Sequence, residues 1–271
     1  QTKEYMEQDD TVRMLLSKYV DPDQFEVKRK LVYTFNALVA NQWRDRRVLL
    51  AGDAAHMTPQ FMGQGASSGV RDAANLGWKL SAVLKGKAGE KVLDSYESER
   101  RDHAKSMIKG SVLLKDLVSM TSPVGSAIRD ITIKSILSTP KLKDWAQEGG
   151  FKPKPVYTKG HYLGLERKHR LSPEGCLSPQ PVVRTIAGKR ILLDQLTGED
   201  YALIGLACDP TVYLSQSSKQ ILKKLGCKFI TLYPFAGRPQ GDVSRDFNSD
   251  LVEVEDIDGH MVDWFKKACR L

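Results

Sequence analysis

The order of apolar and polar residues in the first 51 positions indicates one helix and two strands. Residues 1–20 carry apolar side chains at helical spacing and end before a proline, which predicts an N-terminal helix. Over residues 25–39 apolar side chains alternate imperfectly with polar ones, as in a strand. Residues 48–51 are continuously apolar, which predicts a short strand covered on both faces.

The middle of the chain has the periodicity of long helices. Apolar residues recur at helical spacing over residues 70–84, and Gly86 is placed to end that helix. A longer helix is expected over 92–118, and a shorter one over 128–137 after Ser122-Pro123.

The pattern changes after a segment rich in glycine, proline and lysine. We expect strands at residues 190–193, 202–207, 228–232 and 251–254. Helices are expected at 217–225 and 261–268. Strands that alternate with short helices indicate an α/β module. The predicted organisation is therefore a domain at residues 1–150, a linker at 151–180 and a second domain at 181–271.

Composition narrows the class of protein. The chain has 271 residues, enough for one large domain or two ordinary ones, and no apolar run approaches the ~20 residues that cross a membrane. Its four cysteines show no CxxC or metal-ligand spacing, which predicts free thiols and a cytoplasmic location. We expect no membrane partner and no metal site.

The net charge of +8 raises the question of a nucleic-acid partner. Basic residues are interspersed with acidic ones, and no nucleic-acid-binding module is recognised, so we rank this function last. The densest basic stretch, residues 152–170, has the composition of a solvated linker, and an anion-attracting surface is the alternative.

The stretch from Arg47 to Leu80 has the strongest potential for chemistry. It predicts a strand that ends at Asp53, a loop with Gly63 and Gly65, and then a helix. Free N–H groups at a helix N-terminus attract electron-rich groups, and glycines let a flat ligand approach the backbone. A carboxylate at the end of a strand can accept hydrogen bonds from sugar-type hydroxyls. The combination suits a ligand with a polyol chain and an electron-accepting ring.

Each of these residues also has a purely structural interpretation. Asp53 could cap a turn, and loop glycines commonly form turns. We interpret His56 as structural, because no Ser, Cys or carboxylate constellation accompanies it. Asp72 is expected to cap or to form a salt bridge within its own helix.

The motif GDAAHMTPQFMGQGASSGVRDAANLGWKL (52–80) resembles the second flavin motif of the single-component FAD-dependent aromatic hydroxylases. LDSYESERR (93–101) is similar to the helix that follows in that family. FKPKP (151–155) and GCLSPQP (175–181) resemble the branch that acts on 3-(3-hydroxyphenyl)propionate and related phenols. The resemblance implies an α/β protein: the C-terminal part of an FAD-binding Rossmann-like hydroxylase domain, followed by a small thioredoxin-like α/β domain.

The resemblance also implies roles for individual residues. Asp53 would bond the ribityl hydroxyls of FAD, and the opening of the helix would present backbone N–H groups to the pyrimidine edge of the flavin, where reduced flavin is anionic. Pro59 and Phe61 would border the ring. The implied cofactor-binding residues are Gly52, Asp53, Pro59, Phe61, Gly63, Gln64, Gly65, Ala66 and Ser67.

In such enzymes NADH or NADPH reduces the flavin, O₂ adds to form a flavin C4a-hydroperoxide, and its terminal oxygen attacks a phenolic ring. The implied function is therefore hydroxylation of a phenolic aromatic compound, such as a 3-hydroxyphenylpropionate-like acid. No side chain is required as an acid or base, so we name no catalytic residue.

The chain departs from the family pattern in several ways. Gln60 stands where relatives have a second proline, and Ser67 where many have asparagine. The GxGxxG fingerprint that grips the ADP half of the dinucleotide is absent. We therefore expect a fragment of a longer hydroxylase that binds FAD weakly alone, with an incomplete thioredoxin-like domain that stops before its closing hairpin.

Three functions remain open from the sequence. The first is the aromatic monooxygenase, and the second is a flavin oxidoreductase or epoxidase of the same superfamily. The third is a non-catalytic interaction fragment. The resemblance also implies a homodimer formed through the C-terminal domain, whose cysteines cannot perform dithiol chemistry without a CxxC motif.

Overall fold

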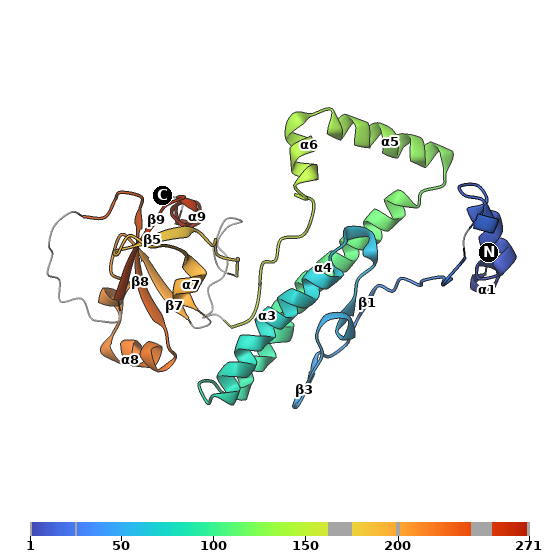
Figure 1. The fold of residues 1–271 in the computed structure, drawn as a ribbon. Coiled ribbons are helices and arrows are strands. Elements are labelled where there is room, and N and C mark those ends of the chain that lie inside the picture. Colours follow the sequence, from blue (N-terminus) through green and yellow to red (C-terminus); the bar gives the residue numbers. More distant parts are fainter. Residues whose placement is uncertain (1, 25, 162–174, 199–200, 240–250, 270–271) are drawn as a thin grey trace.

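The computed structural model describes residues 2–24, 26–161, 175–198, 201–239 and 251–269. Two long helices, α3 (Gly65–Leu84) and α4 (Asp94–Val118), run side by side through the middle of the chain (Figure 1). A smaller α/β domain lies on one side of them. The N-terminal segment lies on the other side.

The N-terminal helix is shorter than its apolar spacing predicts. It is divided into α1 (Lys3–Met6) and α2 (Asp9–Leu16), because Gln8 adopts an extended conformation between them. A short 3-10 helix, η1 (Pro22–Gln24), follows. Tyr19, expected on the apolar stripe, is 84% exposed, so the helix ends before that residue can pack.

The strand predicted over residues 25–39 is wrong for most of its length. Residue 25 lies outside the described residues, and only β1 (Leu38–Val39) forms, paired with β4 (His56–Met57). Leu31 and Tyr33 are exposed. Alternation in the sequence cannot form a strand without a neighbouring strand to pair with.

The strand predicted over residues 48–51 is only partly formed. β3 (Val48–Leu49) pairs antiparallel with β2 (Arg44–Asp45) as a two-residue hairpin. Val48 is 65% exposed, so the expectation that both faces are covered is wrong. The hairpin has no other partner strand in the described part of the chain, and its outer face stays open.

The two long helices form where their periodicity predicts them. Gly86, with φ of +68°, follows α3, and a 3-10 helix, η4 (Glu90–Leu93), leads into α4. Their facing sides enclose a core that includes Trp43, Leu76 and Tyr96. The apolar stripes explain this packing, because each helix buries one face against the other.

Beyond α4 the chain forms α5 (Pro123–Leu137) and α6 (Pro140–Gln147), which project away from the helix pair (Figure 1). Each begins with proline as its first residue, where the missing N–H costs nothing. α5 begins earlier than predicted, and α6 was not predicted. Residues 151–161 and 175–181 form no helix or strand.

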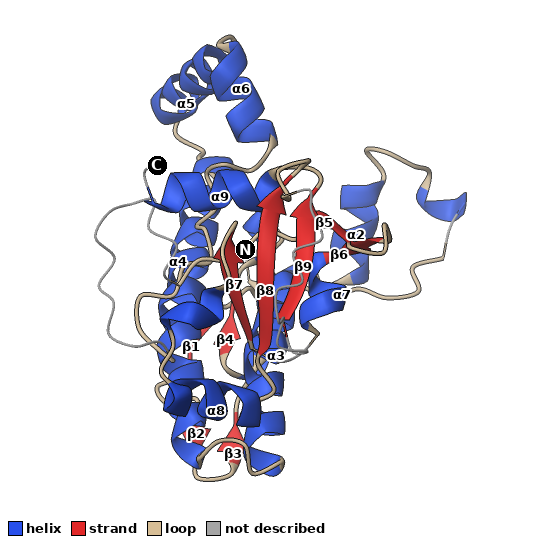
Figure 2. Cartoon of the chain, turned by 90° about the vertical axis from the view of Figure 1, so that its left-hand side faces the viewer, coloured by secondary structure: helices blue, strands red, loops and turns tan. Residues whose placement is uncertain are grey.

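The C-terminal domain is built on one five-stranded sheet with the order β6-β5-β9-β8-β7 (Figure 2). Three neighbouring strands are parallel: β7 (Ala202–Leu206), β8 (Lys228–Pro234) and β9 (Leu251–Asp256). A hairpin of β5 (Val182–Thr185) and β6 (Arg190–Leu192) extends the sheet antiparallel to β9. The sheet therefore carries a hairpin at the beginning of the domain.

Helices cover this sheet. They are α7 (Leu193–Thr197), η5 (Pro210–Tyr213), α8 (Gln216–Lys224) and α9 (His260–Cys269). The core includes Val183, Ile230 and Leu232, with Met261 packed from α9. The predicted strands all form, whereas β5 and α7 were not predicted. The α/β class predicted for the chain is confirmed.

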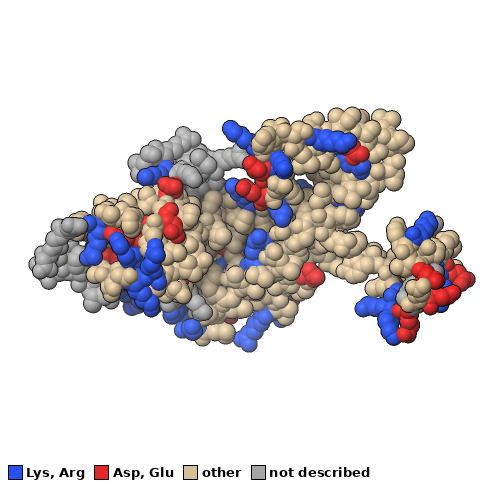
Figure 3. Space-filling view, turned by 45° about the horizontal axis from the view of Figure 1, so that its top comes forward, with Lys and Arg blue, Asp and Glu red and all other residues tan. Residues whose placement is uncertain are grey.

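Surface charge is mixed, as the sequence indicates. Figure 3 shows lysine and arginine side chains gathered on the visible face of the C-terminal domain, with acidic side chains among them. A second group of both signs lies on the N-terminal segment. Within the described residues, no helix combines the length and apolar character that crossing a bilayer requires.

Candidate functional site

The loop between β3 and α3 folds back against the beginning of α3. Two 3-10 turns, η2 (Gly52–Ala54) and η3 (Gln60–Met62), lie on either side of β4. Gly52 has φ of +58° and Gly63 has φ of +61°, a conformation that side-chain-bearing residues rarely adopt. The backbone of Gly52 packs against Gly69 of α3, and a Cβ added to Gly69 would lie 3.6 Å from the Gly52 Cα, an ordinary van der Waals contact.

The predicted site residues lie along this loop. Asp53 is in η2, exposed, and its carboxylate has no hydrogen-bond partner among the described residues. Pro59 is buried, and Phe61 is half-buried, with its ring centroid 5.9 Å from that of Phe35. Gln60, one of the departures from the family pattern, is exposed in η3.

The first turn of α3 is open. Gly65, Ala66 and Ser67 form this turn, and the side chain of the preceding residue, Gln64, makes no capping hydrogen bond to it. Ala66 and Ser67 are exposed. Nothing lies within 4 Å of a Cβ added to Gly63 or Gly65, so the backbone is accessible on that side. The first N–H groups of a helix have no intrahelical partner, and here they have no side-chain cap.

A buried carboxylate holds the other side of the loop. Asp72 is 0% exposed, and its Oδ2 accepts hydrogen bonds from the Gly52 N–H at 3.0 Å and from His56 Nε2 at 2.7 Å. Its Oδ1 accepts from Arg100 Nε at 2.8 Å. Burial alone would raise the pKa of Asp72, but the bonds from His56, Arg100 and Gly52 outweigh it and lower the pKa below its usual value.

Two interpretations from the sequence are tested by this geometry. The premise for His56 is wrong, because its buried ring is bonded to the Asp72 carboxylate, and its structural interpretation stays a prediction. The expectation for Asp72 is wrong, because its salt bridge crosses to Arg100 on α4 instead of remaining within α3. The reason is tertiary: Asp72 lies on the face of α3 that turns toward α4.

A second buried cluster joins the same two helices. Lys79, 0% exposed, donates to Glu99 Oε2 at 2.6 Å and to Asn75 Oδ1 at 2.9 Å. Burial lowers the pKa of Lys79, although Glu99 opposes that shift. Glu99 also accepts from the backbone N–H of His161 at 2.7 Å, which ties the segment after α6 to the helix pair.

Sequence reasoning missed this polar interface between the helices, although a signal existed. Buried polar residues recur along α3 at helical spacing, at Ser68, Asp72, Asn75 and Lys79. Their partners Glu99 and Arg100 are adjacent on α4. A polar stripe with residues of opposite charge on the next helix indicates a buried network, but it does not identify the pairs.

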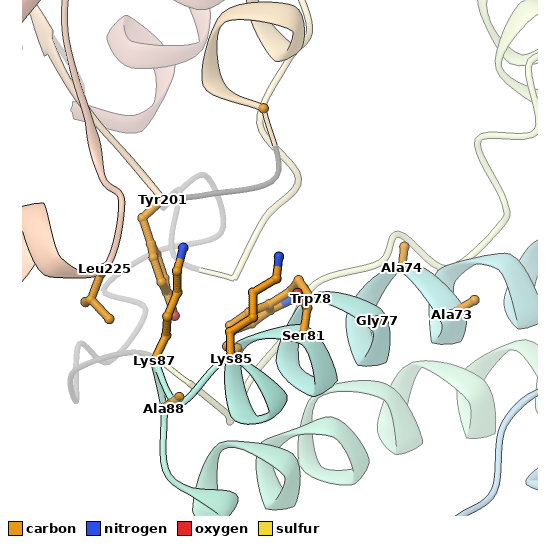
Figure 4. Close-up of a pocket in the computed structure, with 12 residues that line it drawn as sticks. Ala73, Ala74, Gly77, Trp78, Ser81, Lys85, Lys87, Ala88, Tyr201 and Leu225 are labelled. Atoms are coloured by element: carbon orange, nitrogen blue, oxygen red, sulfur yellow. The ribbon is translucent and has the colours of Figure 1, made fainter.

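Two of the cavities formed by the described residues lie elsewhere. The larger, of about 730 Å³, lies between α3 and the C-terminal domain and is lined by residues such as Trp78, Lys85 and Tyr201 (Figure 4). The smaller is lined by Arg44, Glu97 and neighbouring residues. Neither is lined by Asp53 or by residues 63–67. In the described part of the chain no group of three His, Cys, Asp or Glu residues could hold a metal ion.

Comparison with known proteins concerns the family of the chain and not the geometry of the loop. A family model described as "FAD binding domain" matches residues 1–111, and one described as "HcaD C-terminal domain" matches residues 175–270. Over most of its length the chain is similar to FAD-dependent aromatic hydroxylases. It is 39% identical over 266 residues, 98% of its length, to the 3-(3-hydroxy-phenyl)propionate/3-hydroxycinnamic acid hydroxylase of Klebsiella pneumoniae strain 342. The match covers 47% of that relative.

Other relatives are similar in the same way. The hydroxylase of the same name from Mycobacterium avium strain 104 is 39% identical over 253 residues, which cover 93% of this chain and 43% of that protein. Among solved structures, OxyS anhydrotetracycline hydroxylase from Streptomyces rimosus matches with a TM-score of 0.55 and 28% identity, over 74% of this chain and 40% of that one. The chain thus spans about half the length of the curated relatives it matches.

Proposed function

We propose that this chain carries the flavin-ring side of the FAD site in an aromatic monooxygenase. The observation that carries the proposal is the Gly52–Asp53 turn beside the open first turn of α3, within the segment that matches the FAD binding domain. The proposed cofactor-binding residues are those predicted from the sequence.

The donors and acceptors in the loop fit a flavin. The exposed carboxylate of Asp53 can accept hydrogen bonds from the hydroxyls of a ribityl chain. The open N–H groups of Gly65, Ala66 and Ser67 can donate to the oxygen and nitrogen atoms at the edge of a flat ring. The absence of side chains at Gly63 and Gly65 leaves room for that ring against the backbone.

When bound, the flavin would supply the transfer of an oxygen atom from O₂ to the substrate, with electrons from NADH or NADPH. The chain's own residues would bind and orient it. The N-terminus of α3 would stabilise negative charge on the ring edge, because the helix dipole and the open N–H groups act together. Pro59 and Phe61 would border the ring and exclude water.

The proposed substrate is a phenolic compound such as a 3-hydroxyphenylpropionate-like acid. Support comes from the 39% sequence identity between this chain and two hydroxylases named for 3-(3-hydroxy-phenyl)propionate and 3-hydroxycinnamic acid. We also propose a cytoplasmic location and a homodimer. An exposed Cys208 thiol suits a reducing compartment, and exposed Val212, Tyr213 and Ile221 on the C-terminal domain suit a contact between chains.

The test is a titration of the chain, labelled with ¹⁵N at its 21 glycines, with FAD and with ADP. FAD is expected to shift the amide signals of Gly52, Gly63 and Gly65, and ADP is expected to leave them in place. The Asp53→Ala variant should weaken the FAD response. NMR detects weak binding, so the expected low affinity of the chain alone is measurable.

Two results would contradict the proposal in different ways. Absence of any FAD-specific shift at saturating ligand would remove the flavin function and favour the interaction fragment. Submicromolar affinity at full stoichiometry would keep the flavin function and refute the expectation of weak binding by this chain alone.

A further inference from the structure

One carboxylate connects the proposed flavin turn to the core of the molecule. Both oxygens of Asp72 are used: Oδ2 bonds the Gly52 N–H and His56 Nε2, and Oδ1 bonds Arg100 Nε. Gly52 immediately precedes Asp53. The position of the Asp53 backbone therefore depends on a residue that lies 19 positions later in the sequence.

Arg100, which bonds the other oxygen of Asp72, is equally buried. Arg100 is 0% exposed, and its Nη2 donates to the carbonyl oxygen of Ser68 at 3.3 Å and to the Ser68 Oγ at 3.2 Å. Ser68 belongs to α3, one position after the open first turn. Arg100 therefore contacts both Asp72 and the helix end that would face the flavin.

We propose that Asp72 and Arg100 act as positioning residues for flavin, because together they hold the Gly52–Asp53 turn in register with the first turn of α3. This inference rests on the proposed function. Two residues that are buried away from solvent would then influence how tightly the exposed loop binds flavin.

The hydrogen-bond pattern predicts which substitution separates this role from simple stability. In Asp72→Asn, the amide oxygen can accept either from Arg100 or from Gly52 and His56, and the NH₂ group then faces a donor. Asp72→Asn therefore loses either the hydrogen bond from Arg100 or those from Gly52 and His56. If the oxygen faces Arg100, the Gly52 N–H has no acceptor.

Glu99→Gln provides a matched control. Glu99 is a buried carboxylate between the same helices, 5% exposed, and it bonds Lys79, Asn75 and the His161 N–H, none of which belongs to the turn. It should lower stability without affecting the turn. Signals of Gly77 in α3 and Gly110 in α4 report whether the helix pair of each variant is folded.

The experiment measures two quantities on the glycine-labelled chain. The first is hydrogen exchange of the Gly52 amide without ligand, and the second is the FAD dissociation constant. Asp72→Asn is expected to speed Gly52 exchange and to raise the FAD dissociation constant about 10-fold or more, the equivalent of one lost charged hydrogen bond. Glu99→Gln should leave both unchanged. Should Asp72→Asn fail to fold, Arg100→Lys is measured instead, since lysine keeps the charge but lacks the planar guanidinium whose Nε bonds Asp72 and whose Nη2 bonds Ser68.

The possible outcomes distinguish failure of the positioning role from failure of the flavin function. An Asp72→Asn protein, or its Arg100→Lys substitute, that binds FAD as tightly as the unmodified chain overturns the positioning role and leaves the flavin function intact. Equal loss of affinity in Glu99→Gln also overturns it, because the effect is then general destabilisation. An unmodified chain that shows no FAD binding overturns the proposed function and the inference with it.

Discussion

Acidification is expected to destabilise the chain through one buried histidine, His103 on α4. Its Nδ1 lies 3.2 Å from Arg100 Nη1, and its Nε2 lies 3.3 Å from the carbonyl oxygen of Pro153. A guanidinium can only donate, so Nδ1 accepts and Nε2 carries the hydrogen. Burial and the Arg100 charge together lower the pKa of His103 from 6.5 to about 4.

The sign and size of the effect follow from this shift. Between pH 6.5 and about pH 4 the unfolded chain binds a proton at His103 and the folded chain does not. Stability therefore falls as the pH drops through this window and is fully present above it. A pKa shift of this size lowers the free energy of unfolding by about 3 kcal/mol when the pH falls from 6.5 to about 4. That is a large part of a typical folding free energy.

The assay is urea denaturation followed by circular dichroism at a series of pH values from about 7 to about 4. His103→Gln is expected to be less stable at neutral pH but to lose less stability on acidification, by about 3 kcal/mol. His260→Gln is the control, because His260 is exposed and its replacement should leave the slope unchanged. If His103→Gln retains the full pH dependence of the unmodified chain, His103 is not the group that destabilises the folded state on acidification.

Three further predictions concern the helix pair, the turn and association. Lys79→Met should lower the free energy of unfolding, measured by urea denaturation, by about 3–5 kcal/mol, because it leaves the buried Glu99 carboxylate without its counter-charge. Adding Glu99→Gln should recover much of that loss, and simple additivity of the two variants would contradict the pairing. Gly52→Ala should cost about 1–2 kcal/mol because of its left-handed backbone, and an unchanged denaturation midpoint would argue against that conformation. Removal of residues 190–271 should lower the association state in light scattering, whereas an unchanged mass would count against a dimer formed by the C-terminal domain.

Much of the fold was readable from the sequence. The periodicity of α3 and α4, the glycine that follows α3 and the apolar runs of β7, β8 and β9 each depend on residues close together in the chain. Local backbone preferences and one-sided burial act over a few residues, so a pattern of that length records them. The motif around Asp53 is likewise contiguous, and it indicated the family before any geometry was known.

The errors have a different physical origin. Residues 26–37 alternate like a strand and do not form one, because a strand requires a partner that the local pattern does not specify. β5 was missed although it lies within the sheet, between β6 and β9.

By itself, then, the sequence determined the long helices, the strands of the C-terminal domain and the glycine-rich loop that carries Asp53. Only the tertiary structure decided that Asp72 bonds Gly52, His56 and Arg100 at once. Arg100 is 28 residues away from Asp72, and a charged group is buried only where partners from several elements meet it. Such a meeting depends on how the elements pack, which no local pattern of residues records.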